Sequence, residues 1–151
     1  MQVWRICKSM HAAGAFDGEG ARRFGGRWNS PGVPMVYAST SLALAALELF
    51  VHLEPGLAPD DLVFLSATLP DGEPALTIAR AELPADWRSN QVASRKIGDD
   101  WIRATVSLAL MVPSIPIPTE WNVLINPLHP RMSELKVDAP QAFVFDARMF
   151  R

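Results

Sequence analysis

The sequence predicts an α+β fold: one compact domain over residues 1–151, with a mixed or antiparallel β core and a few helices. A chain of 151 residues with 49% hydrophobic content is the size of one ordinary globular domain and can bury about two-thirds of its unfolded surface. Strand-like runs are short and numerous, and only two helical runs stand among them. Because strands and helices do not alternate regularly, a doubly wound parallel sheet is disfavoured.

The first half of the chain predicts two strands, a charged loop and a helix. Residues 2–7 alternate well enough for an opening strand, and residues 32–38 bring Val and Tyr together behind turn residues. Residues 22–32, RRFGGRWNSPG, join the two strands with three arginines and three glycines, and we call this segment the arginine loop. Residues 42–53 are strong helix formers preceded by three hydroxyl residues that can cap a helix. That helix is apolar on nearly every face, so we expect it to be buried on both sides.

The second half predicts short strands around one more helix. Residues 61–69 read as a strand whose following turn, Pro-Asp-Gly, leads to a hairpin partner at residues 75–80. A second helix is expected to begin near residues 98–100, where two acids favour a helix N-terminus, and to run to Ala109 before prolines end it. Three short strands follow, at residues 121–126, 134–137 and 142–145.

Composition and charge exclude several classes of protein. The formal net charge of -2 and the pI near 5.9 disfavour direct binding to nucleic acid, which needs a surplus of Lys and Arg. The lone Cys7 excludes an intramolecular disulfide and a multi-cysteine zinc site, and the three histidines show no metal-ligand spacing. The first residues lack the apolar stretch of a signal peptide, and no apolar run reaches the ~20 residues that cross a bilayer. We therefore expect a cytoplasmic protein without a metal site or membrane contact.

The arginine loop is the first candidate for a binding site. Arg27 is its best anion ligand, since the two glycines before it let backbone come close to a ligand and a guanidinium holds phosphate through two parallel hydrogen bonds. A diphosphate would suit this side chain. In the opposing interpretation, Arg22, Arg23 and Arg27 are solvated charges and Trp28 is a core residue. The loop alone leaves the two interpretations open.

Glu48 is the stronger signal, because it lies in the middle of an otherwise apolar helix. Burying a carboxylate there has a desolvation cost that Leu or Ala would avoid, so a polar group must meet it. His52 follows at i+4 and shares its helical face. Glu48 is therefore either a functional carboxylate or half of a Glu-His pair with a purely structural role.

Four further polar side chains are candidates for the same site. Tyr37 is the only tyrosine and ends the second strand, from which its hydroxyl can point into the same space as Arg27. Ser114 lies between rigid prolines, which restrict its hydroxyl. Asn122 and Asn126 stand four apart on one side of a strand, either as turn caps or as hydrogen-bonding partners of a sugar or amide.

Taken together, these segments resemble the RES domain, a family named for conserved Arg, Glu and Ser residues and found as the toxin of bacterial RES-Xre toxin-antitoxin pairs. The resemblance runs in order along almost the whole chain. The matching stretches are RFGGRWNSPGVPMVYAS, LALAALELFVHL, LPADW, IGDDWI, LMVPSIPIPTEWNVLINPLHP and FVFDARMF. It implies a fold related to ADP-ribosyltransferases and an activity that consumes NAD, by hydrolysis or phosphorolysis or by ADP-ribosylation of a protein.

The resemblance also implies roles for individual residues. Arg27 would hold the diphosphate of NAD, and Glu48 would hold the ribose hydroxyls and stabilise positive charge at the anomeric carbon. Tyr37 and Ser114 would orient nicotinamide or its ribose. The catalytic residues implied are thus Arg27, Tyr37, Glu48 and Ser114, and the residues expected to bind NAD are Arg27, Trp28, Tyr37, Ser114 and Asn126. A supporting phosphate role for Arg23 or Arg5 stays open.

The resemblance implies one small molecule and one macromolecular partner. NAD would be the substrate, with no further cofactor. The partner would be an Xre-like helix-turn-helix antitoxin, which blocks the pocket in a hetero-oligomer and makes the DNA contacts that this chain does not. Two other functions are open: an ADP-ribosyltransferase that modifies a cellular protein, and a non-enzymatic binding module built on the arginine loop.

Overall fold

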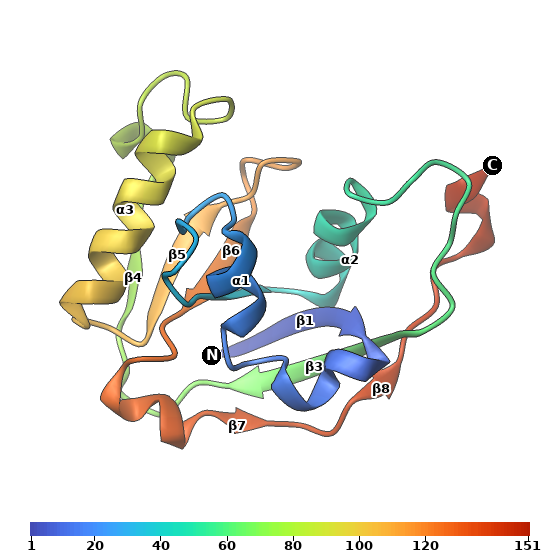
Figure 1. The fold of residues 1–151 in the computed structure, drawn as a ribbon, viewed down its shortest axis with the longest axis horizontal. Coiled ribbons are helices and arrows are strands. Elements are labelled where there is room, and N and C mark those ends of the chain that lie inside the picture. The colour runs from blue at the N-terminus through green and yellow to red at the C-terminus, as the bar shows by residue number, and fades with distance from the viewer.

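The computed structural model describes residues 1–151 and contains one eight-stranded sheet, seen in Figure 1. The strands are β1 (Gln2–Lys8), β2 (Val36–Ser39), β3 (Leu62–Thr68), β4 (Ala75–Thr77), β5 (Ala109–Pro113), β6 (Trp121–Ile125), β7 (Lys136–Val137) and β8 (Gln141–Ala142). They lie in the order β4-β5-β6-β2-β1-β3-β7, and β8 also pairs with β3. Every pair is antiparallel except β4 with β5, which confirms the α+β fold class with a mixed sheet.

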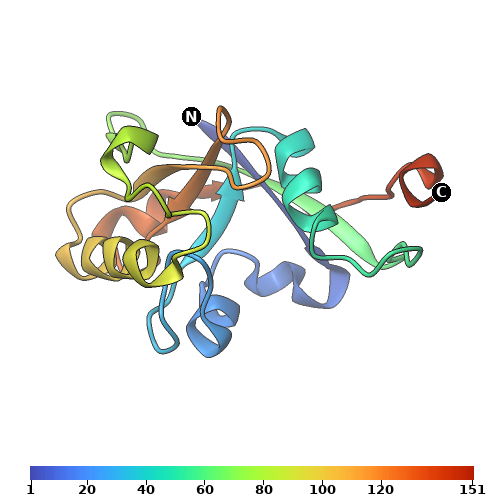
Figure 2. The ribbon, with the colours of Figure 1, turned by 90° about the horizontal axis from the view of Figure 1, so that it is seen from above.

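Three α-helices and four short 3₁₀ helices accompany the sheet. The α-helices are α1 (Glu19–Phe24), α2 (Leu42–Phe50) and α3 (Gln91–Ala104). The 3₁₀ helices are η1 (Ser9–Gly14), η2 (Arg80–Glu82), η3 (Pro130–Glu134) and η4 (Ala147–Phe150). Figures 1 and 2 place α2 and α3 well apart along the sheet, with α1 and the arginine loop between them. None of these helices has both the length and the apolar character needed to cross a membrane.

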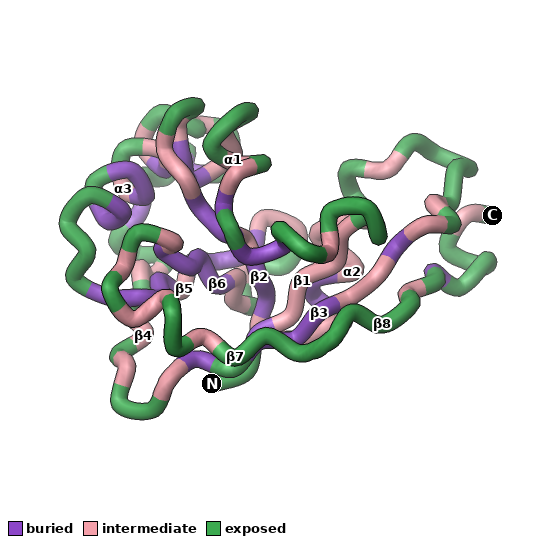
Figure 3. Tube along the Cα trace, turned by 60° about the horizontal axis from the view of Figure 1, so that its bottom comes forward, coloured by how far each residue is buried: buried purple, intermediate pink, exposed green.

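Two clusters of apolar side chains hold the layers together. One lies around β1, β3 and β6 and includes Val3, Ala67 and Val123, all fully buried. The other joins α3 to β5 and β6 and includes Ile102 and Leu124. Figure 3 shows buried segments in β2, β3, β5, β6 and α3, whereas β7 and β8 follow an exposed edge. The cavity described below lies between α2 and α3.

The strands with the clearest alternation were predicted correctly. β1 pairs with β3 over seven residues, from Gln2 opposite Thr68 to Lys8 opposite Leu62. β6 is an interior strand of the sheet, between β2 and β5. β2 begins at Val36, later than the predicted start at residue 32, because residues 31–33 form a turn closed by the Val33 amide donating to the Ser30 carbonyl at 3.1 Å. Part of that loop also belongs to α1, which carries Arg22 and Arg23 and was not foreseen.

The predicted hairpin after the third strand is wrong. β4 does not return along β3; it pairs in parallel with β5, with Ala75 opposite Ala109. Glu73 explains the crossing, because its buried carboxylate accepts hydrogen bonds from the Leu108 amide at 2.7 Å and from Arg131 at 3.0 Å. These bonds attach the connection after β3 to the start of β5.

The predicted second helix also needs correction, since α3 begins seven residues before Gly98 and ends at Ala104. Its N-cap is Asn90, whose side chain accepts from two backbone amides of the first turn. Asp99, taken as a residue of the helix N-terminus, instead lies in the second half of α3 and accepts from the Ser30 amide at 2.9 Å. Residues 109–113, predicted in part as helix, form β5.

The apolar helix is shorter and more exposed than the sequence predicted. Ser41 caps α2 as expected, by accepting from the Leu44 amide at 3.1 Å. The helix ends at Phe50, however, and only Leu44 and Ala45 are buried in it. The expectation of burial on both sides is wrong, because α2 covers β1 and β2 with one face and lines an open cavity with another.

Candidate functional site

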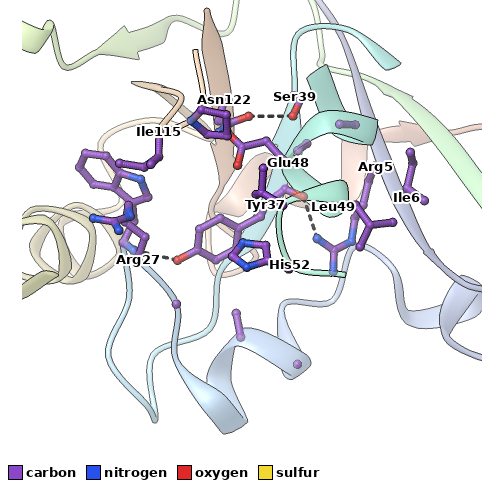
Figure 4. Close-up of a pocket in the computed structure, with 18 of the residues that line it drawn as sticks. Arg5, Ile6, Arg27, Tyr37, Ser39, Glu48, Leu49, His52, Ile115 and Asn122 are labelled. Atoms are coloured by element: carbon purple, nitrogen blue, oxygen red, sulfur yellow. Dashed lines mark hydrogen bonds between the residues drawn. The ribbon is translucent and has the colours of Figure 1, made fainter. Parts of the chain in front are cut away.

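A cavity of about 730 Å³ opens between α2, the arginine loop and the first turns of α3. β1 and β2 contribute its floor, and the segment after β5 closes one side. Its volume is within the range of small-molecule and cofactor sites. Figure 4 shows that Arg27, Tyr37 and Glu48, three of the predicted site residues, come together here from three different elements.

Glu48 presents its carboxylate asymmetrically to the cavity. Oε1 accepts hydrogen bonds from the Ser114 hydroxyl at 2.7 Å and from the Asn122 side-chain amide. Asn122 is itself oriented by Ser39, whose hydroxyl donates to its Oδ1 at 2.7 Å. Oε2 accepts no hydrogen bond within the chain. One oxygen is thus held by two donors, and the other is available to a ligand.

The alternative of a structural Glu-His pair is wrong. α2 stops before His52, which lies in the following turn, exposed at the rim of the cavity. It forms no hydrogen bond or ion pair with Glu48; the partners of that carboxylate come from the segment after β5 and from β6. The i+4 spacing brings two side chains together only within a helix, and α2 does not continue to His52.

Arg27 lies across the cavity from Glu48 and is held by the backbone around it (Figure 4). Its Nη1 donates to the Trp87 carbonyl at 3.1 Å, and its own carbonyl accepts from the Ser94 hydroxyl at 2.7 Å. Burial lowers the pKa of the Arg27 guanidinium, and the nearby Glu48 carboxylate acts in the opposite direction. The side chain stays cationic at any physiological pH, because an arginine pKa lies far above it.

Tyr37 lines the cavity with its ring, but its hydroxyl is fully used within the protein. It donates to Asn29 Oδ1 at 2.6 Å and accepts from the Trp28 amide at 2.9 Å. Burial raises the pKa of this phenol above its usual value, so it stays neutral. At Gly26 an added Cβ would lie 2.6 Å from the Tyr37 oxygen, which explains why glycine is needed there. Tyr37 therefore holds the arginine loop in place.

Trp28 belongs to the core and to the cavity wall at once. Its side chain is 2% exposed and its ring lies 6.5 Å from that of Trp87, centre to centre. It also lines the cavity beside Arg27. The interpretation of Trp28 as a core residue is confirmed, and its contact with a ligand stays a prediction.

Two predicted ligand contacts are corrected by the structure. Ser114 is fully buried and is not part of the cavity surface; it acts on Glu48. Asn126 lies outside the cavity, where its amide donates to the Ile102 carbonyl at 3.0 Å and accepts from the Leu128 amide at 2.9 Å. Asn122 is the asparagine that reaches the site. The two differ because β6 ends at Ile125, and Asn126 turns to serve the next connection.

The other arginines fall into two groups. Arg22 and Arg23 pair with Glu19 on α1, at 2.6 and 3.1 Å, and are solvated charges of that helix. Arg5 lines the cavity from β1, on the side away from Arg27, and donates from Nη1 to the Tyr37 carbonyl at 2.7 Å. Of the two arginines left open by the sequence, Arg5 is therefore the one that reaches the site.

The comparisons with known proteins agree on one family. Residues 2–146 match the RES domain. The "Prs ADP-ribosylating toxin" of Sphingobium sp. is 37% identical over 98% of this chain and 96% of that protein. Proteins named "Toxin Res" from Yersinia enterocolitica and Pseudomonas putida are 33% and 36% identical, each over 99% of this chain and 99% and 100% of their own.

One solved structure shares the fold. The toxin-antitoxin complex MbcT-MbcA of M. tuberculosis contains a chain that superimposes with a TM-score of 0.72, covering 99% of this chain and 86% of that one. The identity is 17%, so this likeness concerns the fold. It confirms the predicted fold.

Proposed function

Because the chain belongs to the RES domain family, whose curated relatives are named as toxins, we propose that it is a toxin that cleaves the nicotinamide-ribose bond of NAD. The observation that carries this proposal is the carboxylate of Glu48, held through Oε1 by Ser114 and Asn122 with Oε2 free toward the cavity. Arg27 stands across the same cavity. Arg27 can bind an anion, and the fixed carboxylate can accept hydrogen bonds from hydroxyl groups. The pair therefore suits a substrate that combines a diphosphate with a ribose.

In the proposed reaction, Arg27 holds the diphosphate and so brings the nicotinamide ribose to Glu48. Oε2 accepts a ribose hydroxyl. As the bond between the anomeric carbon and the nicotinamide nitrogen breaks, its electron pair leaves with nicotinamide, and positive charge grows on the ribose. The nearby carboxylate stabilises that charge. Water or inorganic phosphate then attacks the anomeric carbon and releases a proton to solvent, which yields ADP-ribose or its phosphate.

A second function is favoured by one comparison. The Sphingobium relative, 37% identical, is named for ADP-ribosylation. In that reaction the same cavity would bind NAD and break the same bond, and a protein side chain would replace water as the attacking group. The two functions share Arg27 and Glu48 and differ only in the acceptor.

The acceptor can be identified by mass. Purified protein is mixed with NAD, with and without inorganic phosphate, and the products are analysed; a second arm adds cell lysate and follows ADP-ribose label onto protein. Free nicotinamide with ADP-ribose or its phosphate supports NAD cleavage, and label on one protein supports transfer. If neither appears while NAD still binds, both proposed reactions are wrong.

Glu48→Gln supplies the sharpest test of the site. Glutamine keeps the size of the side chain and can still accept from Ser114 and Asn122, but it turns an amide donor toward the ribose. We expect turnover to fall at least about 100-fold, the effect of removing one preorganised electrostatic group. Glu54→Gln is the matched control, since Glu54 is exposed and lies outside the cavity. Turnover of Glu48→Gln at the native rate would remove Glu48 from the mechanism.

We further propose that the chain forms a hetero-oligomer with an antitoxin of the Xre-like helix-turn-helix type, which would cover the cavity. The cavity rim supports such a contact, since Phe24 is 82% and Val51 52% exposed there. The M. tuberculosis structure is itself a toxin-antitoxin complex. Co-expression with the neighbouring gene product should give a complex that does not cleave NAD; separate elution of the two proteins would contradict the proposal.

A further inference from the structure

Arg95 contributes to the cavity wall from the second turn of α3, beside the arginine loop. Its Nε donates to the Gly26 carbonyl at 2.8 Å, and Gly26 directly precedes Arg27. Its two η nitrogens form no hydrogen bond or ion pair within the chain. One hydrogen bond thus fixes the Arg95 guanidinium at the backbone of the arginine loop and leaves its other donors unused.

The charged residues around the cavity indicate which kind of ligand the unused nitrogens of Arg95 would bind. Arg5, Arg27 and Arg95 line it, and Glu48 is the only acidic residue that does. This positive surplus stands in a chain whose formal net charge is -2. Arg5 lies away from Arg27, across Tyr37, and has already committed Nη1 to a carbonyl (Figure 4). Arg95 bonds to the residue before Arg27, and the Arg27 side chain bonds to the Trp87 carbonyl just before α3. Both arginines therefore line the cavity where the arginine loop meets the start of α3.

We propose that Arg95 is a second arginine that binds the diphosphate of the substrate, together with Arg27. A diphosphate carries two negative charges and several acceptor oxygens, and a guanidinium offers parallel donors that match them. Because Nε is already anchored, little side-chain freedom remains to be lost when the η nitrogens bind. The inference rests on the proposed function, since it assigns the diphosphate of NAD to this edge of the cavity.

The test compares a ligand with a diphosphate and one without. ADP and nicotinamide are titrated calorimetrically into wild type, Arg95→Gln, Arg95→Lys and Arg103→Gln. Arg95→Gln should weaken ADP binding about tenfold or more, the value of a lost charge-assisted hydrogen bond, and leave nicotinamide binding unchanged. Arg95→Lys should recover part of the ADP affinity. Arg103→Gln removes the same charge from the same helix outside the cavity and should change neither affinity.

Each outcome decides the assignment. Equal ADP affinity in wild type and Arg95→Gln overturns it while leaving the proposed function intact. A parallel loss of ADP and nicotinamide binding shows that Arg95 only supports the loop, and also overturns it. Absence of both ADP and nicotinamide binding to wild type removes the proposed function itself, and the assignment with it. Should Arg95→Gln fail to fold, Arg95→Lys against Arg103→Gln makes the same comparison.

Discussion

At the scale of single residues, the hydroxyl of Tyr37 shows how a side chain can serve a site without touching the ligand. It is a hydrogen-bond donor to Asn29 and an acceptor from the Trp28 amide. Asn29 is fully buried and donates in turn to the carbonyls of Ala21 and Val33, each at 2.8 Å. These bonds set the path of the backbone on both sides of Arg27. The position of the guanidinium therefore depends on groups that never meet the substrate.

Tyr37→Phe should lower the free energy of unfolding by about 1–3 kcal/mol, because it leaves the Trp28 amide and the Asn29 oxygen without their partner. Chemical denaturation measures this loss. We also expect KM for NAD to rise more than kcat falls, since the loop that holds the diphosphate loosens. Native stability combined with a large loss of kcat would contradict this role and place the hydroxyl on the reacting ribose.

At the scale of elements, α3 acts as the support of the arginine loop. Ser94 donates to the Arg27 carbonyl, and Asp99 accepts from the Ser30 amide. Between them Gly98 allows the helix to approach so closely that an added Cβ would lie 1.7 Å from the Trp28 carbonyl oxygen. The loop is thus fixed by tertiary contacts along one face of a helix.

Gly98→Ala should push α3 away from the loop and cost at least about 2 kcal/mol of unfolding free energy, with loss of NAD binding. Gly20→Ala is the matched stability control: Gly20 lies on α1 with nothing within 4 Å of an added Cβ, so alanine should gain up to about 1 kcal/mol. Thermal and chemical unfolding compare the two. Equal stability of Gly98→Ala and wild type would show that the helix and loop are not in close contact.

α1 supplies a prediction on pH. Hydrogen bonds from Arg22, and then from Arg23, lower the pKa of Glu19 to about 2. A carboxyl whose pKa is lower in the folded state stabilises the protein above its ordinary pKa of about 4.3, and this stabilisation disappears as the pH falls toward 2. The melting temperature of Glu19→Gln should therefore lie slightly below that of wild type at pH 7, and the two should converge near pH 2.

The effect of Glu19 is expected to be small, because the ion pairs are exposed and salt weakens them. Glu54→Gln is the control, since Glu54 is exposed and forms no ion pair. A difference between Glu19→Gln and wild type that persists unchanged to pH 2 would show that the carboxylate charge is not its cause.

At the scale of the whole molecule, the site exists because distant parts of one sheet converge on it. Glu48 comes from α2, its donors from the chain around β5 and β6, and Arg27 from the connection between β1 and β2. The hydrogen bonds that join Glu48 to Ser114 and Asn122 span 66 and 74 residues of sequence. Local unfolding of any of these elements would disturb the carboxylate.

A ligand that binds only this assembled state must raise its stability. We expect ADP-ribose at 100 times its dissociation constant to stabilise the protein by about 2.7 kcal/mol, seen as a rise in melting temperature. Adenosine, which lacks the diphosphate, should give a smaller shift at the same concentration. A complete absence of stabilisation by NAD and ADP-ribose would favour the non-enzymatic binding module.

The amino-acid sequence by itself determined the fold class and the strands β1, β3 and β6, because alternation of apolar residues and nearby turn residues are local properties. It also singled out Arg27 and Glu48, since a charge among glycines and a carboxylate in an apolar helix stand out without any knowledge of their neighbours.

Only the tertiary structure decided which residues contact Arg27 and Glu48. The connection that leads to the parallel pairing of β4 with β5 is held at Glu73, which accepts from the Leu108 amide, 35 residues away and just before β5. The choice of Asn122 over Asn126 depends on where β6 ends. Arg95 gave no local signal, because the predicted helix began after it. Such contacts follow from strand register and helix placement across the whole chain, and no short stretch of sequence contains them.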